Sequence, residues 1–215
     1  MELNYNKNIN IELFDTLEEI SIKTSKLLKN GNIAISGGST YLKLLKSWAK
    51  MNLNLNNIDF YPVDERVVDF DSEFSNWGNS WRVFLKNNNK NRDHHFPNAA
   101  KYNDILKNID METIFLGVGD DGHTASLFSS SYVFENNNLR ARSSISPKEP
   151  LNRVSLTGKY IASAKNIVII FLGEGKESIV NMVLSGKDLP ITTLLKRVNK
   201  GTIYIHRPLL GDNNG

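Results

Sequence analysis

One histidine lies in a glycine-rich segment that could hold an imidazole for proton transfer. Residues 117–126 read Gly-Val-Gly-Asp-Asp-Gly-His-Thr-Ala-Ser and directly follow a near-continuous apolar run at 113–116. Asp120 and Asp121 are both close enough along the chain to orient the ring of His123. An imidazole titrates near neutrality, and a carboxylate can fix its tautomer, so this pattern favours a general base. The alternative is a histidine with a structural role.

A second segment has the composition of a phosphate site. Ser36-Gly37-Gly38-Ser39-Thr40 follows the apolar residues 33–35 and precedes a predicted helix. Two glycines allow the backbone to approach a ligand, and the first N–H groups of a helix attract anions. The alternative is an ordinary glycine turn with a Ser or Thr helix cap. No Gly-Lys-Ser/Thr follows, so the segment is not a Walker P-loop.

Charged residues stand at three further positions beside predicted strands. Asp64-Glu65-Arg66 comes directly after residues 58–63, with Ser75-Asn76 a short loop later. Lys176 follows a Gly-Glu-Gly turn after residues 167–172, and Arg153 begins a further predicted strand within residues 152–157. Each has a plain alternative, which is a structural ion pair for the first group and a solvated charge for Lys176 and Arg153.

Two other site types are tested against the same residues. Residues 117–122 match Gly-x-Gly-x-x-Gly after a strand, but no acidic residue follows about 20 residues later in a second strand. Dinucleotide binding is therefore not expected. The chain has no cysteine, and no two of its four histidines have ligand spacing with a carboxylate, so we do not expect a metal site.

The elements that must position these side chains alternate between strand and helix. Such alternation predicts an α/β fold with a mostly parallel sheet flanked by helices, and ligands of such sheets bind at the carboxyl ends of the strands. The predicted strands are 8–14, 33–35, 58–63, 113–116, 167–172 and 202–206, and the predicted helices are 15–28, 39–50, 75–85, 99–107 and 176–184. The first helix is expected to open on a capping box formed by Asp15 and Glu18.

Composition narrows the class of protein. A chain of 215 residues with 40% hydrophobic residues is long enough to form one α/β domain, and we expect residues 1–215 to be that domain. Its basic residues are scattered and its formal charge is +3, which argues against a nucleic-acid partner. We find no basic region followed by an apolar segment at the start and no membrane-length apolar run, so we expect a cytoplasmic protein with no membrane partner.

Taken together, these segments resemble the 6-phosphogluconolactonase family, within the superfamily that also holds the glucosamine-6-phosphate deaminases. They occur in the family's order and span most of the chain, and the most specific is Asp-Gly-His-Thr-Ala-Ser-Leu-Phe at residues 121–128. The other segments are Ser36-Gly37-Gly38-Ser39-Thr40, Asp64-Glu65-Arg66 with Ser75-Asn76, Arg153-Val154-Ser155-Leu156-Thr157 and Gly173-x-Gly-Lys176. The resemblance implies a Rossmann-like α/β fold of the deaminase/isomerase type.

The resemblance implies hydrolysis of 6-phospho-D-glucono-1,5-lactone to 6-phospho-D-gluconate, the second step of the oxidative pentose phosphate pathway, with no cofactor. His123 would be the base, oriented by Asp121 or Asp120, and Arg66 or main-chain N–H groups would stabilise the oxyanion. The partner is then a small sugar-phosphate lactone, and the protein a monomer or weak homodimer. The expected substrate-binding residues are Gly37, Gly38, Ser39, Thr40, Asp64, Arg153 and Lys176, of which Gly38, Ser39, Thr40, Arg153 and Lys176 would hold the phosphate.

Three positions bear on the alternatives. Deaminases resemble one another in Asp-Gly-His-Ile-Ala-Phe-Asn-Glu, whose Glu supports ring opening, whereas Phe128 occupies that position here. Arg66 stands where deaminases typically carry an aromatic residue, so both positions favour the lactonase. The remaining alternative is a non-catalytic sugar-phosphate-binding protein, against which the intact His123 segment argues. The family usually has proline where this chain has Tyr41, and we expect Tyr41 to loosen the loop before it.

Overall fold

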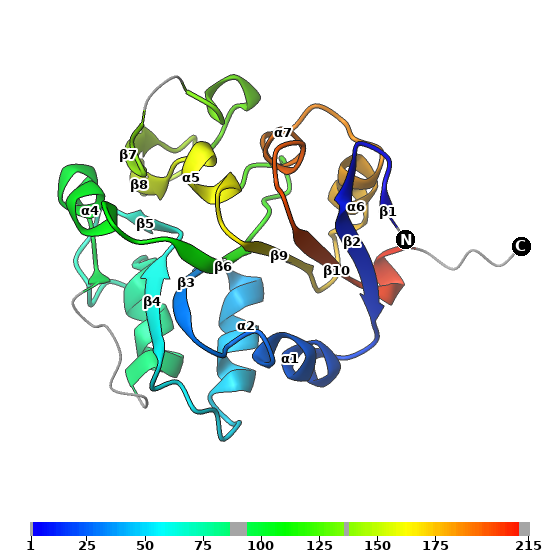
Figure 1. Ribbon diagram of the computed structural model, residues 1–215, viewed down its shortest axis with the longest axis horizontal. Helices are drawn as coiled ribbons and strands as arrows, with labels where there is room; N and C mark the ends of the chain where they lie inside the picture. Colours follow the sequence, from blue (N-terminus) through cyan, green and yellow to red (C-terminus); the bar gives the residue numbers. More distant parts are fainter. Residues whose placement is uncertain (1, 87–93, 136–137, 211–215) are drawn as a thin grey trace, which may run out of the picture.

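The computed structural model describes residues 2–86, 94–135 and 138–210, which form the strands and helices labelled in Figure 1. The strands are β1 (Glu2–Leu3), β2 (Asn6–Phe14), β3 (Gly31–Ile35), β4 (Ile58–Pro62), β5 (Asp64–Arg66), β6 (Met111–Leu116), β7 (Ala141–Ile145), β8 (Asn152–Leu156), β9 (Asn166–Phe171) and β10 (Gly201–His206). The α-helices are α1 (Leu17–Ser25), α2 (Ser39–Trp48), α3 (Asn76–Ser80), α4 (Ala99–Leu106), α5 (Gly158–Ala162), α6 (Glu177–Leu184) and α7 (Pro190–Leu195). A π-helix, η1 (Trp81–Leu85), continues α3, and two short 3₁₀ turns are η4 (Ser130–Tyr132) and η5 (Arg207–Leu210).

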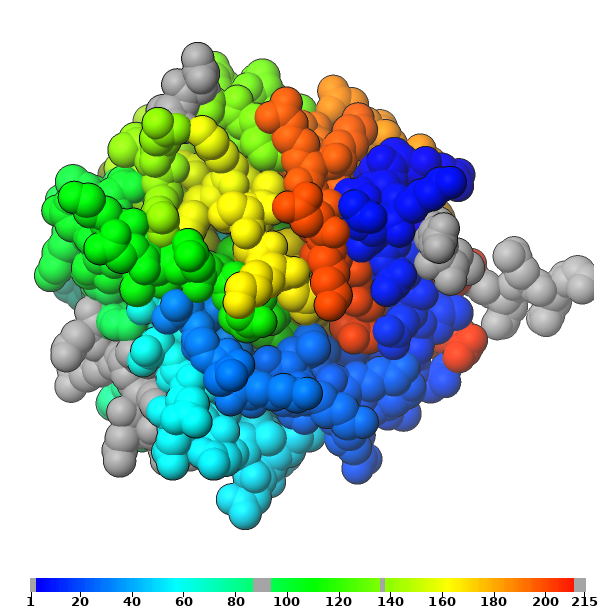
Figure 2. Space-filling view, in the orientation of Figure 1, coloured from blue at the N-terminus to red at the C-terminus, as the bar shows by residue number. Residues whose placement is uncertain are grey.

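The central sheet has seven strands in the order β1-β2-β10-β9-β6-β3-β4. Every neighbouring pair is parallel except β1 with β2, so the predicted mostly parallel α/β sheet is confirmed. The N-terminal and C-terminal parts of the chain meet in this sheet, because β10 pairs along its whole length with residues Ile9–Phe14 of β2. Figure 2 shows the result on one face, where the blue N-terminal segment lies beside the orange-to-red C-terminal segment.

Alternating residues of the central strands pack into two apolar cores, one on each face of the sheet. On β6, Ile114 and Leu116 belong to one core, and Phe115 belongs to the other. Helices α1, α2 and α3 cover the second core, with side chains such as Trp48 fully buried. Burial on both faces explains why these strands have near-continuous apolar sequences. Because the adjacent strands β9, β6, β3 and β4 are parallel, their carboxyl ends lie at one edge of the sheet.

A second, smaller sheet with the order β5-β8-β7 lies beside that edge and is antiparallel throughout. Asp64-Glu65-Arg66, for which the sequence predicts no element, forms strand β5 and pairs with Arg153–Ser155 of β8. Three consecutive charged residues have low strand propensity, and here the pairing with β8 holds them extended. Strand β7 and helices α5 and α7 also have no counterpart in the sequence-based prediction.

The first helix is shorter at both ends than the predicted 15–28, because it begins at Leu17 and ends at Ser25. Its N-cap is Thr16, whose side chain accepts a hydrogen bond from the Glu19 N–H, and Glu19 in turn accepts from the N–H of Asp15. The predicted capping box of Asp15 and Glu18 is therefore wrong, because Thr16 caps the helix and Glu19 bonds the residue before the cap. The helix ends at Ser25 rather than Leu28. Over the part of the chain that the structure describes, no helix is both long and apolar enough to span a bilayer.

Candidate active site

Two adjoining pockets open at the carboxyl ends of these four strands. The inner pocket, of about 180 Å³, lies around the start of α2, and the outer pocket, of about 740 Å³, lies against the small sheet. The inner pocket is lined by Ser36, Gly38–Tyr41, Asn76 and Gly117–Val118, and the outer pocket by Asp120–Asp121, Ser126, Phe128, Ser146–Glu149 and Arg153. Residues common to both walls are Asp64, Arg66, Gly119, His123, Ala125 and Lys176.

The His123 imidazole is held by one carboxylate at this common wall. Its Nδ1 lies 2.5 Å from Oδ1 of Asp121, and the same oxygen accepts from the His123 backbone N–H at 3.1 Å. A carboxylate only accepts, so Nδ1 carries the hydrogen and Nε2 is left to accept a proton. Burial raises the pKa of Asp121, but the His123 N–H and ring more than offset this, and the pKa is lowered overall. Asp121 therefore stays ionised and orients the ring.

The loop that carries His123 is tightly folded. The Gly119 N–H donates to the His123 carbonyl at 2.9 Å, and the Thr124 hydroxyl donates to the Gly117 carbonyl at 2.8 Å. A Cβ at Gly119 would lie 2.2 Å from the His123 ring, so glycine is required there by close approach. Ala125 adopts a φ of 51°, a strained value for a residue with a side chain. Such strain is common at functional sites, because the surrounding contacts must maintain it.

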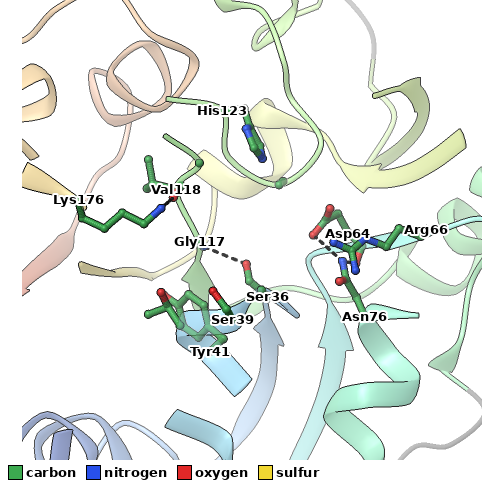
Figure 3. Close-up of a pocket in the computed structure, with 14 residues that line it drawn as sticks. Ser36, Ser39, Tyr41, Asp64, Arg66, Asn76, Gly117, Val118, His123 and Lys176 are labelled. Carbon is green, nitrogen blue, oxygen red and sulfur yellow. Dashed lines mark hydrogen bonds between the residues drawn. The ribbon is translucent and has the colours of Figure 1, made fainter. Parts of the chain in front are cut away.

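Helix α2 presents its N-terminus to the inner pocket. Its N-cap, Gly38, has no side chain to bond the first N–H groups, which remain available to a ligand. Ser36 connects this loop to the His123 loop, because its hydroxyl donates to the Phe115 carbonyl and accepts from the Gly117 N–H, both at 3.0 Å (Figure 3).

Tyr41 does not loosen this loop, contrary to expectation. Its side chain is 1% exposed, and its hydroxyl donates to the carbonyls of Leu116 at 2.8 Å and Val168 at 3.3 Å. Burial raises the pKa of Tyr41 well above its ordinary value, so the hydroxyl stays protonated and able to donate. Tyr41 therefore fastens the first turn of α2 to strands β6 and β9.

Asp64 and Arg66 stand on the other side of the inner pocket, held by the start of α3. Figure 3 shows both beside Asn76, across the pocket from Lys176. The Asn76 amide donates to the Asp64 backbone carbonyl at 3.2 Å, and the Ser126 hydroxyl donates to Oδ2 of Asp64 at 2.7 Å. Ser126 was not singled out from the sequence, because it is 62 residues from Asp64 and only the fold brings them together.

The buried carboxylate of Glu65 fixes this side of the site. It accepts the backbone N–H groups of Arg66, Asn76 and Trp77 at 2.7, 2.7 and 2.8 Å, and the Ser75 hydroxyl at 3.0 Å. Burial raises its pKa, and these four donors act in the opposite direction. Glu65 therefore joins β5 to the first turn of α3, and this sets where Arg66 and Asn76 stand.

Lys176, which lines both pockets, forms an ion pair with Asp120, which lines the outer pocket. The lysine Nζ lies 2.5 Å from Oδ1 of Asp120 and 3.4 Å from the carbonyl of Val118. The choice left open by the sequence is thereby resolved, because Asp120 contacts Lys176 and Asp121 contacts His123. Lys176 also lines the inner pocket, as Gly38 does.

Two other expected binding residues lie elsewhere. Gly37 does not line the inner pocket; a Cβ there would lie 2.4 Å from Cβ of Asn76, so Gly37 lets the first loop pack against α3. Arg153 lines only the outer pocket, where Nη2 donates to Ser146 Oγ at 3.3 Å and to the Lys148 carbonyl at 3.4 Å. Throughout residues 2–86, 94–135 and 138–210, no cluster of three or more His, Asp or Glu side chains has the arrangement of a metal site.

Comparisons with known proteins place the chain in a family. The profile of the family described as glucosamine-6-phosphate isomerases/6-phosphogluconolactonase matches residues 8–204. The 6-phosphogluconolactonase of Aggregatibacter actinomycetemcomitans is 30% identical over 178 residues, which cover 75% of this chain and 76% of that protein. The fold is similar to that of a Trypanosoma cruzi 6-phosphogluconolactonase (TM-score 0.80, 20% identity, 100% and 99% coverage) and of a monomeric glucosamine-6-phosphate deaminase (0.74, 18%, 93% and 98%). The chain therefore belongs to the family of glucosamine-6-phosphate isomerases and 6-phosphogluconolactonases.

Proposed function

We propose that this protein hydrolyses 6-phospho-D-glucono-1,5-lactone to 6-phospho-D-gluconate, with His123 as the general base. The observation that carries the proposal is the position of the His123 imidazole. Asp121 fixes it at 2.5 Å in the wall shared by the two pockets. The phosphate-binding elements lie on one side of it, and Arg66 lies on the other (Figure 3).

The chemistry asks little of the protein, because a lactone carbonyl is already electrophilic. Nε2 of His123 takes a proton from water as the water oxygen attacks C1. The tetrahedral intermediate then collapses, the bond from C1 to the ring oxygen breaks, and the imidazolium returns its proton to that oxygen. Asp121 accepts the Nδ1 hydrogen throughout, so it stabilises the imidazolium without changing its own protonation.

Arg66 is the proposed donor to the oxyanion that forms at C1. Its Nη1 donates to the Phe74 carbonyl at 2.9 Å, which fixes the guanidinium at the edge of the inner pocket. A guanidinium is always charged, and in a partly buried site it stabilises developing negative charge. Main-chain N–H groups of the glycine-rich loop are the alternative donors.

The 6-phosphate is held at the start of α2. The backbone N–H groups there, the hydroxyls of Ser39 and Thr40, and the Lys176 ammonium all reach the inner pocket. Gly38 contributes only backbone, so nothing obstructs the approach of a phosphate. Together they offer a cation, several neutral donors and the positive end of a helix.

Phe128 argues against the deaminase alternative within the same family. Its ring lies 5.1 Å from the His123 ring, at the position where the deaminase pattern has the ring-opening glutamate. A phenyl ring cannot transfer a proton. Since both activities occur on this fold, that side chain carries more weight here than the similarity in structure.

We propose further that residues 1–215 act as one domain. The two apolar cores lie on opposite faces of one central sheet, and the outer pocket takes Arg153 from the small sheet and Lys176 from the turn after β9. Neither sheet would form the site without the other.

A coupled assay tests the function. Glucose-6-phosphate dehydrogenase generates the lactone, and 6-phosphogluconate dehydrogenase reports its hydrolysis. We expect the pure protein to accelerate hydrolysis well above the spontaneous rate, and to release no ammonia from glucosamine 6-phosphate. Ammonia release without lactone hydrolysis would support the deaminase, and tight sugar-phosphate binding with neither reaction would support a non-catalytic binder.

A further inference from the structure

Three polar side chains stand in one row across the small sheet. Arg66 of β5 lies directly opposite Arg153 of β8, and Arg153 lies directly opposite Ser144 of β7. Both pairs are antiparallel, and directly opposed residues of an antiparallel pair project from the same face of the sheet. Two guanidinium groups and a hydroxyl are thereby brought together, and the two guanidinium groups line the outer pocket.

Each of these side chains has a buried polar atom that makes no hydrogen bond within the described ranges: Nε of Arg66, Nε of Arg153 and Oγ of Ser144. Arg153 is only 7% exposed, and its two hydrogen bonds, at 3.3 and 3.4 Å, are long. Buried polar atoms in proteins nearly always have partners, so three neighbours without one, beside a pocket, point to a ligand.

The charges in the row point to an anion. Like charges directly opposed across two strands repel, and among the described residues neither guanidinium is in ion-pair contact with a carboxylate. The nearby carboxylates bond elsewhere: Asp64 to Ser126, Glu65 to the start of α3, and Glu149 to the Leu151 N–H. Burial and then the charge of Arg66 lower the pKa of Arg153, and the nearby carboxylates of Asp64, Glu65 and Glu149 offset this only in part.

We propose that Arg66 and Arg153 form a carboxylate subsite, which holds the C1 end of the ligand. This inference rests on the proposed function and assigns Arg153 to the carboxylate rather than to the phosphate. Figure 3 shows Arg66 across the pocket from Lys176. A sugar acid with its phosphate at Lys176 would therefore extend past His123 and place C1 at the small sheet. The planar fork of a guanidinium matches a carboxylate in two parallel hydrogen bonds.

The reaction creates the group that this subsite fits. Water adds to C1, the bond from C1 to the ring oxygen breaks, and that oxygen receives the proton that His123 took from the water. The new carboxylic acid then loses its remaining proton to solvent and becomes a carboxylate. The neutral lactone carbonyl is thus replaced by an anion next to two cations, so the subsite favours the product over the substrate.

Isothermal titration calorimetry of two ligands tests the proposal. 6-Phospho-D-gluconate and D-glucitol 6-phosphate share the phosphate and the carbon chain, and they differ at C1 in carrying a carboxylate or a neutral alcohol. We expect the parent protein to bind the gluconate about 10- to 100-fold more tightly, the range for charge-assisted contacts. Arg153→Gln should remove most of this preference and change the affinity for the glucitol by less than about 2-fold. Unchanged glucitol binding also reports that the variant is folded.

The matched control is Lys148→Gln, which removes an exposed cation from the same pocket and should leave the preference within about 3-fold of the parent, the range for an exposed charge. Arg153→Lys keeps the charge without the fork, and an intermediate preference is expected. A parent protein that binds both ligands equally would overturn the proposal, and so would equal weakening of both ligands by Arg153→Gln. A preference for the gluconate in a protein that hydrolyses no lactone would refute the proposed function and leave this subsite standing.

Discussion

The ion pair between Lys176 and Asp120 provides a test of phosphate binding, because substitutions of its two residues should change substrate affinity in opposite directions. The Lys176 side chain is 23% exposed and lies 2.5 Å from Asp120, whose side chain is 81% exposed. If Lys176 binds the substrate phosphate, removing the lysine should weaken substrate binding, and removing the competing carboxylate should strengthen it.

The magnitudes follow from the surroundings of each group. Lys176→Ala loses one charge-assisted contact to a phosphate, worth about 1.5–3 kcal/mol, or about 10- to 100-fold in kcat/KM. The phosphate is remote from C1, so the loss should appear mainly in KM. The pair with Asp120 is mostly solvated, and exposed pairs contribute about 0.2–1 kcal/mol. Asp120→Asn should therefore lower KM by about 1.5- to 5-fold.

The assay compares two substrates. Initial rates are measured with 6-phospho-D-glucono-1,5-lactone and with D-glucono-1,5-lactone, which has no phosphate, and the spontaneous rate is subtracted. Both variants should act on the unphosphorylated lactone as the parent does. If Lys176→Ala slows the two lactones equally, Lys176 is not a phosphate ligand. If Asp120→Asn raises KM as Lys176→Ala does, the pair maintains the shape of the pocket instead.

Four further predictions concern the first loop, the residues around the base, and the independence of activity from metal. Gly37→Ala places a Cβ 2.4 Å from Asn76 and should lower the melting temperature by about 2 to 12 °C, whereas Gly38→Ala, with no atom within 4 Å, should leave it nearly unchanged in calorimetry. Asp121→Asn should reduce kcat by at least about 10-fold, because His123 loses its orienting acceptor. The lowered pKa of Asp121 means that its contact with His123 is complete above the carboxyl's ordinary pKa of 3.8 and is lost only as the pH falls below it, so NMR titration of the parent should find no protonation of Asp121 between pH 5 and 8. Treatment with EDTA should leave activity unchanged, and its loss with recovery on adding Zn²⁺ would mean that His123 is a ligand.

The central strands were predictable because burial on both faces requires near-continuous apolar sequences. Residues 114–116 and 167–171 are apolar throughout, and both segments lie in strands with neighbours on either side. Strand β5 has no such apolar sequence. Asp64-Glu65-Arg66 is extended because it pairs with β8, about 90 residues away, and no local pattern carries that information.

Within the site, local spacing identified the residues but could not assign their partners. Along the chain, Asp120 and Asp121 are equally plausible partners of the His123 ring. In the structure Asp120 is bonded to Lys176, and Asp121 is bonded to His123. The same limit explains Arg153, which sequence reasoning grouped with the phosphate. Its position opposite Arg66 follows from the register of the small sheet.

The most direct test of the account is the rate of lactone hydrolysis by His123→Ala. His123 lies in a loop at the pocket wall with a side chain that is 34% exposed, so the variant should fold like the parent. Removal of a general base should lower kcat by about 10²- to 10⁴-fold with KM within a few-fold of the parent value. A variant that keeps more than about half of the parent's kcat, measured in the coupled assay above the spontaneous rate, would contradict the account, because another group would then activate the water.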